Sequence, residues 1–139
     1  MGTRGFWGIT KNGEEKMIYS HSDSYPEALG KDVVFLIQNN LENLATIFDK
    51  LILVKNIDNL DQSEARFILM GPTELANVEI EKKYLSESAM EAFEKGYLEY
   101  GYMIDLDKSV LKLYKEKNKL SEINLEKIKF KEVQKIFGN

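Results

Sequence analysis

The sequence lacks several residues on which common kinds of site depend: it has no cysteine, one histidine, one tryptophan and two prolines. Without cysteine, the chain forms no disulfide, no thiolate zinc site and no cysteine nucleophile. It also has no apolar run long enough to cross a membrane, and the N-terminal stretch MGTRGFWGITKNGEE lacks the apolar segment of a signal peptide. We therefore expect an intracellular protein that does not contact a membrane.

The composition is that of a folded protein. Of its 139 residues, 43% are hydrophobic and 30% are charged, which excludes a disordered or collagen-like chain. A chain of this length buries roughly two-thirds of its unfolded surface when it folds. We expect a single domain over residues 1–139.

Charge is unevenly distributed along the sequence. Residues 1–107 carry 10 Lys and Arg against 19 Asp and Glu, a net charge of −9, whereas residues 108–139 carry 9 Lys against 4 Glu, or +5, which together give −4. An acidic body repels the phosphate backbone, so non-specific nucleic-acid binding is not expected. The basic C-terminal segment is interpreted as a solvated helix face, and contact with an anionic partner is the alternative.

The N-terminal segment predicts a β-hairpin over residues 3–22. Residues 3–10 are rich in aromatic and β-branched side chains, and residues 16–22 form the returning strand. Asn12-Gly13 lies between them and is the strongest short hairpin signal, because both residues tolerate positive φ.

A helix is expected from Pro26 to Asn40. Ser24 and Glu27 have the spacing of a capping box, and Pro26 lies in the first turn, where its missing N–H costs no hydrogen bond. A bend is expected near Asn39 and Asn40. The buried stripe of this helix is expected to be Leu29, Val33, Leu36, Ile37 and Leu41.

The helical middle of the chain is expected to cover residues 26–95. Residues 51–54 fit either the end of a helix or a short strand, and periodicity does not separate the two. A short helix is expected over residues 63–70, and a clearer one over residues 86–95 ends at Gly96.

Residues 97–115 predict a second hairpin, with Asp107-Lys108 in its turn, and a lysine-rich helix is expected over residues 125–137. The tyrosines of this hairpin are interpreted as packed sheet residues rather than a platform for stacking bases; they are Tyr97, Tyr100 and Tyr102. The fold class is therefore α+β. We expect an antiparallel sheet of about four strands, made by the two hairpins, with helices packed on one face.

The densest group of polar side chains lies where the first hairpin leads into the helix. On an extended backbone Tyr19, His21, Asp23 and Tyr25 point to one side, and a helix N-terminus nearby favours an anion. Arginine holds a phosphate through two hydrogen bonds, and tryptophan and tyrosine stack on bases. The candidate ligand-binding residues are Thr3, Arg4, Trp7, Tyr19, His21, Asp23 and Tyr25. The structural alternative is that Asp23 and Ser24 only cap the helix and that His21 and the tyrosines are half-buried sheet residues.

Two further arrangements are open. If the two hairpins are neighbours, one imidazole and three carboxylates could bind a hard divalent ion; these belong to His21, Asp23, Asp105 and Asp107. The alternative is that Asp107 starts a turn and Asp105 faces solvent.

The other arrangement is a nucleophilic site, in which Thr3 is the candidate nucleophile and His21 is its base. The sequence has no Walker loop and no GxGxxG, GxSxG, HExxH or CxxC motif, so no catalytic residue, metal site or cofactor is assigned.

The opening MGTRGFWGI and the segment IYSHSDSYPEALG resemble a group of small uncharacterised phage and prophage proteins, and YGYMIDLDKSVLKLY is similar to the C-terminal hairpin of that group. The matching N-terminal positions are Thr3, Arg4, Gly5, Tyr19, His21, Asp23, Tyr25, Pro26, Leu29 and Gly30. Ser22 and Ser24 stand where relatives carry Trp and Gly, which removes an aromatic surface. The resemblance implies a phage or prophage origin and supplies no activity.

The leading hypothesis is a phage-encoded accessory or anti-defence protein of the bacterial host cytoplasm that sequesters a small anionic, nucleotide-like ligand. The first alternative is a protein–protein inhibitor of a host bacterial defence enzyme, docking through an exposed helix or the lysine-rich C-terminal face. The second alternative is a small hydrolase built on Thr3, His21 and Asp23. A binding role is favoured over an enzymatic one, with a small ligand or a host protein as the partner and a homo-oligomer as the expected assembly.

Overall fold

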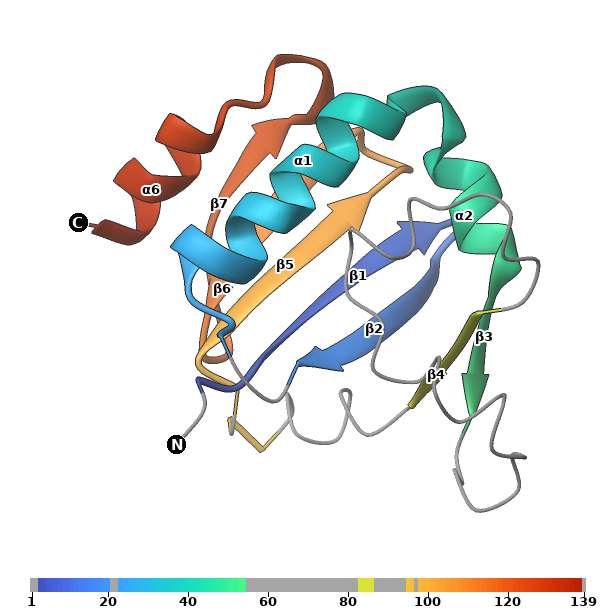
Figure 1. Ribbon diagram of the computed structural model, residues 1–139, viewed down its shortest axis with the longest axis horizontal. Coiled ribbons are helices and arrows are strands. Elements are labelled where there is room, and N and C mark those ends of the chain that lie inside the picture. The colour runs from blue at the N-terminus through green and yellow to red at the C-terminus, as the bar shows by residue number, and fades with distance from the viewer. Residues whose placement is uncertain (1–2, 21–22, 55–82, 87–94, 97, 139) are drawn as a thin grey trace.

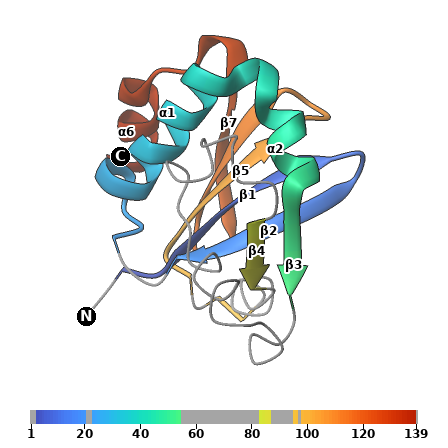
Figure 2. The same ribbon diagram turned by 45° about the vertical axis from the view of Figure 1, so that its right-hand side comes forward.

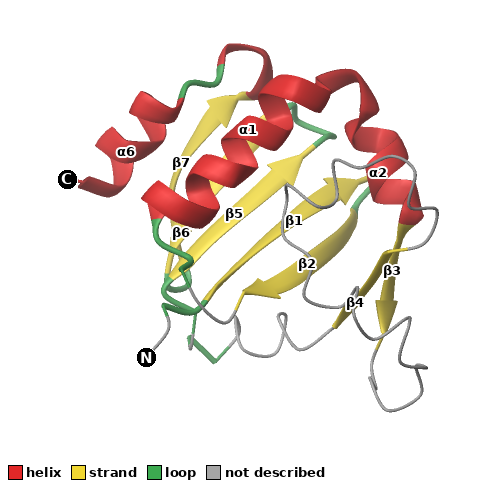
Figure 3. Ribbon diagram, in the orientation of Figure 1, coloured by secondary structure: helices red, strands yellow, loops and turns green. Residues whose placement is uncertain are grey.

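The computed structural model describes residues 3–20, 23–54, 83–86, 95–96 and 98–138. Within these residues a five-stranded sheet carries helices on one face, and a separate pair of short strands lies beside it (Figure 1). Figure 3 shows the same arrangement coloured by secondary structure.

The large sheet has the strand order β2-β1-β5-β6-β7. Its strands are β1 (Gly5–Lys11), β2 (Glu14–Ser20), β5 (Tyr100–Asp105), β6 (Val110–Lys115) and β7 (Asn118–Asn124). The β1 and β5 strands pair in parallel, and the other neighbouring pairs in this sheet are antiparallel. Parallel neighbours need a long crossover connection rather than a tight turn, and the chain between β2 and β5 provides it.

The described helical segments form two groups along the chain, one between β2 and β3 and the other after β7. The helical segments are η1 (Pro26–Gly30), α1 (Lys31–Asn40), η2 (Leu41–Asn43), α2 (Leu44–Lys50), η4 (Leu125–Lys127) and α6 (Phe130–Gly138). The α1 and α6 helices lie on the same face of the large sheet in both views (Figures 1 and 2). After α2, β3 (Leu51–Val54) pairs in parallel with β4 (Lys83–Ser86).

The turns of the two hairpins are joined to each other. Asn12 and Gly13 have φ values of 53° and 77°, which a tight two-residue hairpin turn requires. Their backbone N–H groups donate to the carboxylate of Asp107, at 2.7 and 2.9 Å. Because Asp107 lies between β5 and β6, this contact fixes the first turn against the second.

The helix-facing side of the sheet carries the main hydrophobic core. Side chains alternate along a strand, and the strand residues of this core are Trp7, Ile9, Ile18, Tyr102, Ile104, Leu111, Leu113 and Ile123. The expected helix stripe is confirmed by the buried residues Leu29, Val33, Leu36 and Ile37. Leu41 is 39% exposed, because the chain changes to the 3₁₀ turn η2 at this residue and leaves the helical spacing.

The opposite side of the sheet, which we call the second face, carries a smaller buried cluster. Its residues are Phe6, Met17, Leu98 and Met103. The ring of Phe6 lies against Gly101 of the neighbouring strand, where any Cβ would collide with it. The ring also contacts Tyr114, with 5.8 Å between the ring centroids. Phe6 therefore depends on the absence of a side chain at position 101.

Charged side chains lie beside this cluster on the second face. The Asp105 carboxylate is nearly buried, accepts a hydrogen bond from the Lys108 backbone N–H at 3.1 Å and pairs with Lys112 Nζ at 2.9 Å. Burial raises the pKa of Asp105, but the hydrogen bonds from Lys112 and from the backbone outweigh burial and hold the pKa below its ordinary value. A further pair joins Lys119 and Glu122 at 2.8 Å. The alternative expectation that Asp105 faces solvent is therefore wrong.

The structure confirms the α+β class and corrects the sheet. An antiparallel sheet of about four strands was expected, whereas the observed sheet has five strands and one parallel pair. The additional strand is β7, whose pairing with β6 shifts register between Leu113 and Tyr114. This irregularity interrupts the simple alternation that identifies a strand in a sequence.

Several helix boundaries also differ from expectation. Residues 51–54 form a strand, so the helical middle expected over residues 26–95 is interrupted. The helix expected over residues 125–137 begins at Phe130, because Asn124 caps a 3₁₀ turn first, with its side chain accepting from the Glu126 N–H at 2.8 Å. The helix expected over residues 63–70 lies outside the described residues, as does most of the one expected over residues 86–95.

Candidate functional site

The segment that joins β2 to η1 is held against the start of β1. Ser24 is 0% exposed, its N–H donates to the Thr3 carbonyl oxygen at 3.2 Å, and its hydroxyl donates to the Ser20 carbonyl oxygen at 3.3 Å. The hydroxyl therefore does not cap the helix. Tyr25 occupies the N-cap position without a side-chain hydrogen bond, so the expected capping box of Ser24 and Glu27 is wrong.

Gly5 allows Ser24 to approach β1 this closely. A Cβ at position 5 would lie 2.5 Å from the Cβ of Ser24 and 2.6 Å from the carbonyl oxygen of Tyr100. Real side chains do not approach each other at such distances, so a larger residue would displace the segment from the strand. The glycine in the Thr-Arg-Gly motif thus has a packing role.

Tyr102 completes this arrangement from the neighbouring strand. Its hydroxyl donates to the Ser24 carbonyl oxygen at 2.8 Å, and its ring lies against Gly30, where a Cβ would be 3.0 Å away. Burial raises the pKa of Tyr102, so the phenol remains a proton donor to that carbonyl. The interpretation of Tyr102 as a packed sheet residue is confirmed. We call Gly5, Ser24, Gly30 and Tyr102 the Ser24 cluster.

For three of the candidate ligand-binding residues, the structure describes no exposed side chain. Trp7 is 1% exposed and belongs to the main core, which corrects the expectation that its ring stacks on a ligand. The backbone of Tyr19 pairs with that of Phe6 in the first hairpin. His21 lies outside the described residues.

The other four candidates lie at one end of the sheet. Thr3 is partly exposed, Arg4 and Asp23 are exposed, and Tyr25 is 39% exposed. The backbone of Arg4 is fixed, because its carbonyl oxygen accepts a hydrogen bond from the Glu99 N–H at 2.8 Å. The Arg4 guanidinium makes no ion pair with any residue in the described part of the chain.

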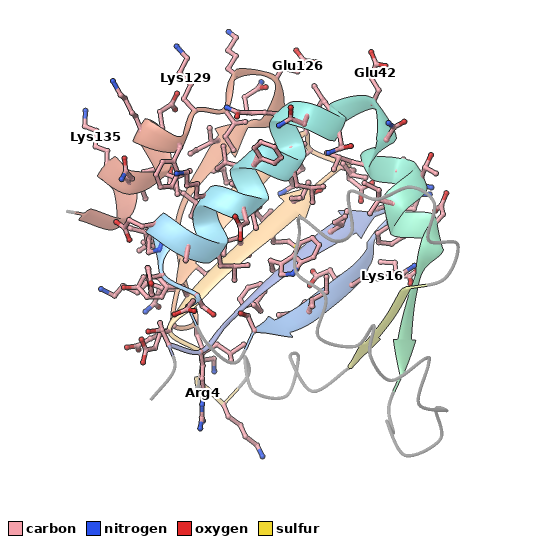
Figure 4. The ribbon with its side chains drawn as sticks, viewed as in Figure 1. Arg4, Lys16, Glu42, Glu126, Lys129 and Lys135 are labelled. Carbon is pink, nitrogen blue, oxygen red and sulfur yellow. The ribbon has the colours of Figure 1, made fainter. Side chains whose placement is uncertain are left out.

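Arg4 and the Ser24 segment lie on different sides of the strand. Successive side chains of an extended backbone point to opposite sides. The Cβ direction of Gly5 points to Ser24, so the side chain of Arg4, one residue earlier, leaves on the opposite side. Figure 4 shows Arg4 pointing away from the body of the molecule at the end of the sheet. The structure therefore does not place Arg4 in a recess with the segment that carries Asp23 and Tyr25.

The carboxylates of the proposed metal site lie at opposite ends of the sheet. Asp23 follows β2 near Gly5, whereas Asp105 pairs with Thr10 at the far end of β1, about 16 Å along the strand at about 3.3 Å per residue. Asp107 accepts hydrogen bonds from the first hairpin turn. Among the described residues, no three His, Asp or Glu side chains come together as metal ligands. The four-residue metal site is contradicted by this topology.

Lys16 is a buried cation that the sequence reasoning missed. Its ammonium group donates to the Phe48 carbonyl oxygen at 2.7 Å, near the end of α2, and lies 4.2 Å from the Phe48 ring centroid. Burial lowers the pKa of Lys16, although the negative charges of Glu14 and Asp49 act to raise it. Its position two residues before the buried Ile18 in β2 was the available signal, since alternate residues share one face. Lys11 of the same hairpin pairs with Asp49 of α2 at 2.7 Å, so we interpret Lys16 and Lys11 together as the residues that fix α2 against the hairpin.

The C-terminal segment presents four exposed lysines, which we call the α6 lysine face: Lys127, Lys129, Lys131 and Lys135. None of them makes an ion pair with another residue that the structure describes. Figure 4 shows Lys129 and Lys135 pointing outward on the side of the molecule away from Arg4. The charge difference along the sequence already indicated this face.

The remaining findings concern the whole chain. No helix in the described ranges combines the length and the apolar character that crossing a membrane requires. The resemblance to phage and prophage proteins stays an expectation. Comparison of the sequence and the fold with known proteins gave no match to a family model, to a curated protein or to a solved structure.

Proposed function

We propose that this protein is a phage-encoded accessory protein of the anti-defence type that sequesters a small anionic, nucleotide-like ligand. The observation that carries the proposal is Arg4, an exposed guanidinium without an ion-pair partner among the described residues, on a backbone fixed by hydrogen bonds on both sides. A preorganised backbone lowers the entropy that binding costs, and a guanidinium holds a phosphate through two parallel hydrogen bonds.

The ligand would lie across the end of the sheet rather than inside a recess. Arg4 and the segment that carries Tyr25 lie on different sides of the start of β1, so a ligand that contacts both residues must extend around this end of the sheet. The half-exposed ring of Tyr25 offers a face on which a base stacks. Thr3, Asp23, Tyr19 and His21 remain candidate contacts in this proposal, and Trp7 does not.

Binding is favoured over catalysis because the described side chains best suited to acid–base chemistry hold the fold together. The carboxylates of Asp105 and Asp107 accept hydrogen bonds from two turns. The phenol of Tyr102 donates to the Ser24 carbonyl oxygen. A hydrolase built on Thr3 and His21 remains a prediction, which requires turnover of a phosphodiester or amide that disappears in His21→Ala.

Isothermal titration with cyclic nucleotides, cyclic dinucleotides and ADP-ribose tests the proposal. We expect the wild-type protein to bind at least one of them and Arg4→Ala to weaken that binding by about tenfold, or 1.4 kcal/mol. Arg4→Lys distinguishes two modes of phosphate binding, because lysine keeps the positive charge but cannot form the two parallel hydrogen bonds of arginine. Weaker binding by Arg4→Lys would indicate the two hydrogen bonds, and unchanged binding would indicate attraction of charge alone. Lys117→Ala is the matched control for loss of an exposed positive charge elsewhere. If the wild-type protein binds none of these nucleotides, the proposed ligand class is wrong.

The α6 lysine face favours a second candidate function, inhibition of a host bacterial defence enzyme through protein–protein contact. Four exposed lysines without described ion-pair partners lie between residues 127 and 135 of a chain whose net charge is −4. Lysines of this kind gain affinity and association rate from a partner of opposite charge. Loss of inhibition when these lysines are replaced, with Arg4→Ala still active, would separate this function from ligand sequestration.

A further inference from the structure

We propose that the α6 lysine face and the neighbouring Phe35 form one docking surface for an acidic protein segment that also carries an apolar side chain. This inference rests on the second candidate function and names its surface and the chemistry of its partner. It requires no part of the Arg4 site.

Lys131 and Lys135 lie on the exposed side of α6 because the other side of this helix is packed. Val133 is fully buried, and Ile136 and Phe137 pack against the main core. Lys131 and Lys135 are one helical turn apart and therefore lie on the same face of α6. Figure 4 shows Lys129 and Lys135 extending from the same outer side of the molecule. The lysines of α6 thus point to the solvent on one side of the helix.

Phe35 adds an apolar anchor next to these lysines. It is 54% exposed, although Val34 and Leu36 on either side of it are buried. One turn further along α1, the Gln38 side-chain amide donates to the Ile128 carbonyl oxygen at 3.0 Å. Ile128 lies between Lys127 and Lys129, so this hydrogen bond places the side of α1 that carries Gln38 beside the lysine segment. Phe35 is three residues before Gln38, and residues at this spacing are neighbours on a helix surface.

An acidic protein segment fits this surface better than a nucleic acid. Residues 1–107 carry a net charge of −9, which repels a long polyanion as it extends beyond the lysines. Glu126 and Glu132 lie among the lysines and are exposed, so the surface is not uniformly positive. A short acidic segment can match this mixed pattern, and an exposed aromatic ring that becomes buried is a common centre of protein–protein contacts.

Fluorescence anisotropy with a labelled peptide of Glu-Asp-Leu repeats tests the surface, with a Gln-Asn-Leu peptide and an oligo-dT strand as the comparison probes. We expect the wild-type protein to bind the acidic peptide, and the triple variant Lys129→Gln/Lys131→Gln/Lys135→Gln to bind it about tenfold more weakly. The matched control is Lys108→Gln/Lys115→Gln/Lys117→Gln, which removes the same charge from other exposed positions. Phe35→Ala should weaken binding several-fold at unchanged net charge.

The outcomes separate the proposals. No binding of the acidic peptide at low salt, or equal losses in the two triple variants, overturns the docking surface. Tighter binding of oligo-dT than of the peptide assigns the lysines to nucleic acid and also overturns it. If peptide binding requires the lysines but the protein inhibits no host enzyme, the second candidate function is wrong and the docking surface is supported. Arg4→Ala should leave peptide binding unchanged.

Discussion

The two faces of the large sheet are stabilised in different ways. The helix-facing side is almost entirely apolar and joins strands to η1, α1, α2 and α6 in one continuous core. Among the described residues the second face has four buried hydrophobic residues and, beside them, an ion pair that connects β5 to β6 and another within β7. Substitutions on the helix-facing side should therefore affect how helices pack on the sheet, whereas those on the second face should act within the sheet.

The largest effect is expected for Trp7→Ala on the helix-facing side. Removing a fully buried aromatic side chain from a core lowers the free energy of unfolding by about 3–5 kcal/mol, and Trp7 is 1% exposed. Urea unfolding followed by far-UV circular dichroism measures the change, because the variant has lost the only tryptophan. Tyr25→Ala, at an exposed position, is the control and should change stability little. A Trp7→Ala protein as stable as wild type would contradict the assignment of Trp7 to the core.

On the second face, Gly101→Ala tests the close packing of Phe6. A Cβ at position 101 collides with the Phe6 ring, and overpacking of this kind costs about 1–3 kcal/mol. The double variant Gly101→Ala/Phe6→Leu should recover part of the loss, since the smaller side chain makes room. Urea unfolding of the two single variants and the double variant gives the coupling free energy. Strict additivity would show that Phe6 and Gly101 do not compete for the same space.

The ion pair of the second face makes a smaller and pH-dependent contribution. Asp105→Asn should lower the free energy of unfolding at neutral pH by about 1.5 kcal/mol, at the lower end of the range for hydrogen bonds to charged groups, because the Lys112 side chain is 19% exposed. The folded-state pKa of Asp105 is lowered from 3.8. Its stabilisation is therefore present above pH 3.8 and is lost as the pH falls through the lowered folded value.

Acid titration of stability checks this sign. Wild-type stability should decrease more steeply than that of Asp105→Asn below pH 3.8. Glu99→Gln, at an exposed carboxylate with no described ion pair, is the matched control and should retain the wild-type profile. Equal acid profiles of wild type and Asp105→Asn would show that the pair with Lys112 contributes no stability.

Local signals in the sequence predicted the local parts of this fold. Asn12-Gly13 identified the first hairpin, because its positive φ values are required by the turn itself. The spacing of Leu29, Val33 and Leu36 identified the buried side of the first helix. The parallel pairing of β1 with β5 was not predictable in this way, because it depends on contacts between segments far apart in the chain and not on either strand's own pattern.

The candidate site was predictable in composition but not in the roles of its residues. Gly5, Ser24 and Gly30 lie in or beside the segments that carry the candidate residues, yet Gly5 packs against Ser24, and Ser24 and Gly30 contact Tyr102. Residue spacing shows which side chains share a side of a strand. It does not show that Ser24 lies against the start of β1 and accepts a hydrogen bond from Tyr102, a residue far away in the sequence.

The smallest expected effect is that of Tyr102→Phe, which removes one hydroxyl from the helix-facing side without changing its apolar packing. The Ser24 carbonyl oxygen loses its donor at 2.8 Å in a buried position, and a net loss of about 1 kcal/mol is typical of such a hydrogen bond. Tyr100→Phe is the matched control, because Tyr100 is only partly buried and lies in the same strand. Thermal unfolding should show a lower midpoint for Tyr102→Phe alone. Ser24 borders Tyr25, so nucleotide binding by Tyr102→Phe should also weaken if the Ser24 cluster positions the Tyr25 segment. Equal midpoints for the two variants would mean that the Ser24 segment is held by Gly5 packing and by its own backbone hydrogen bonds, and that the polar contact on the apolar face is dispensable.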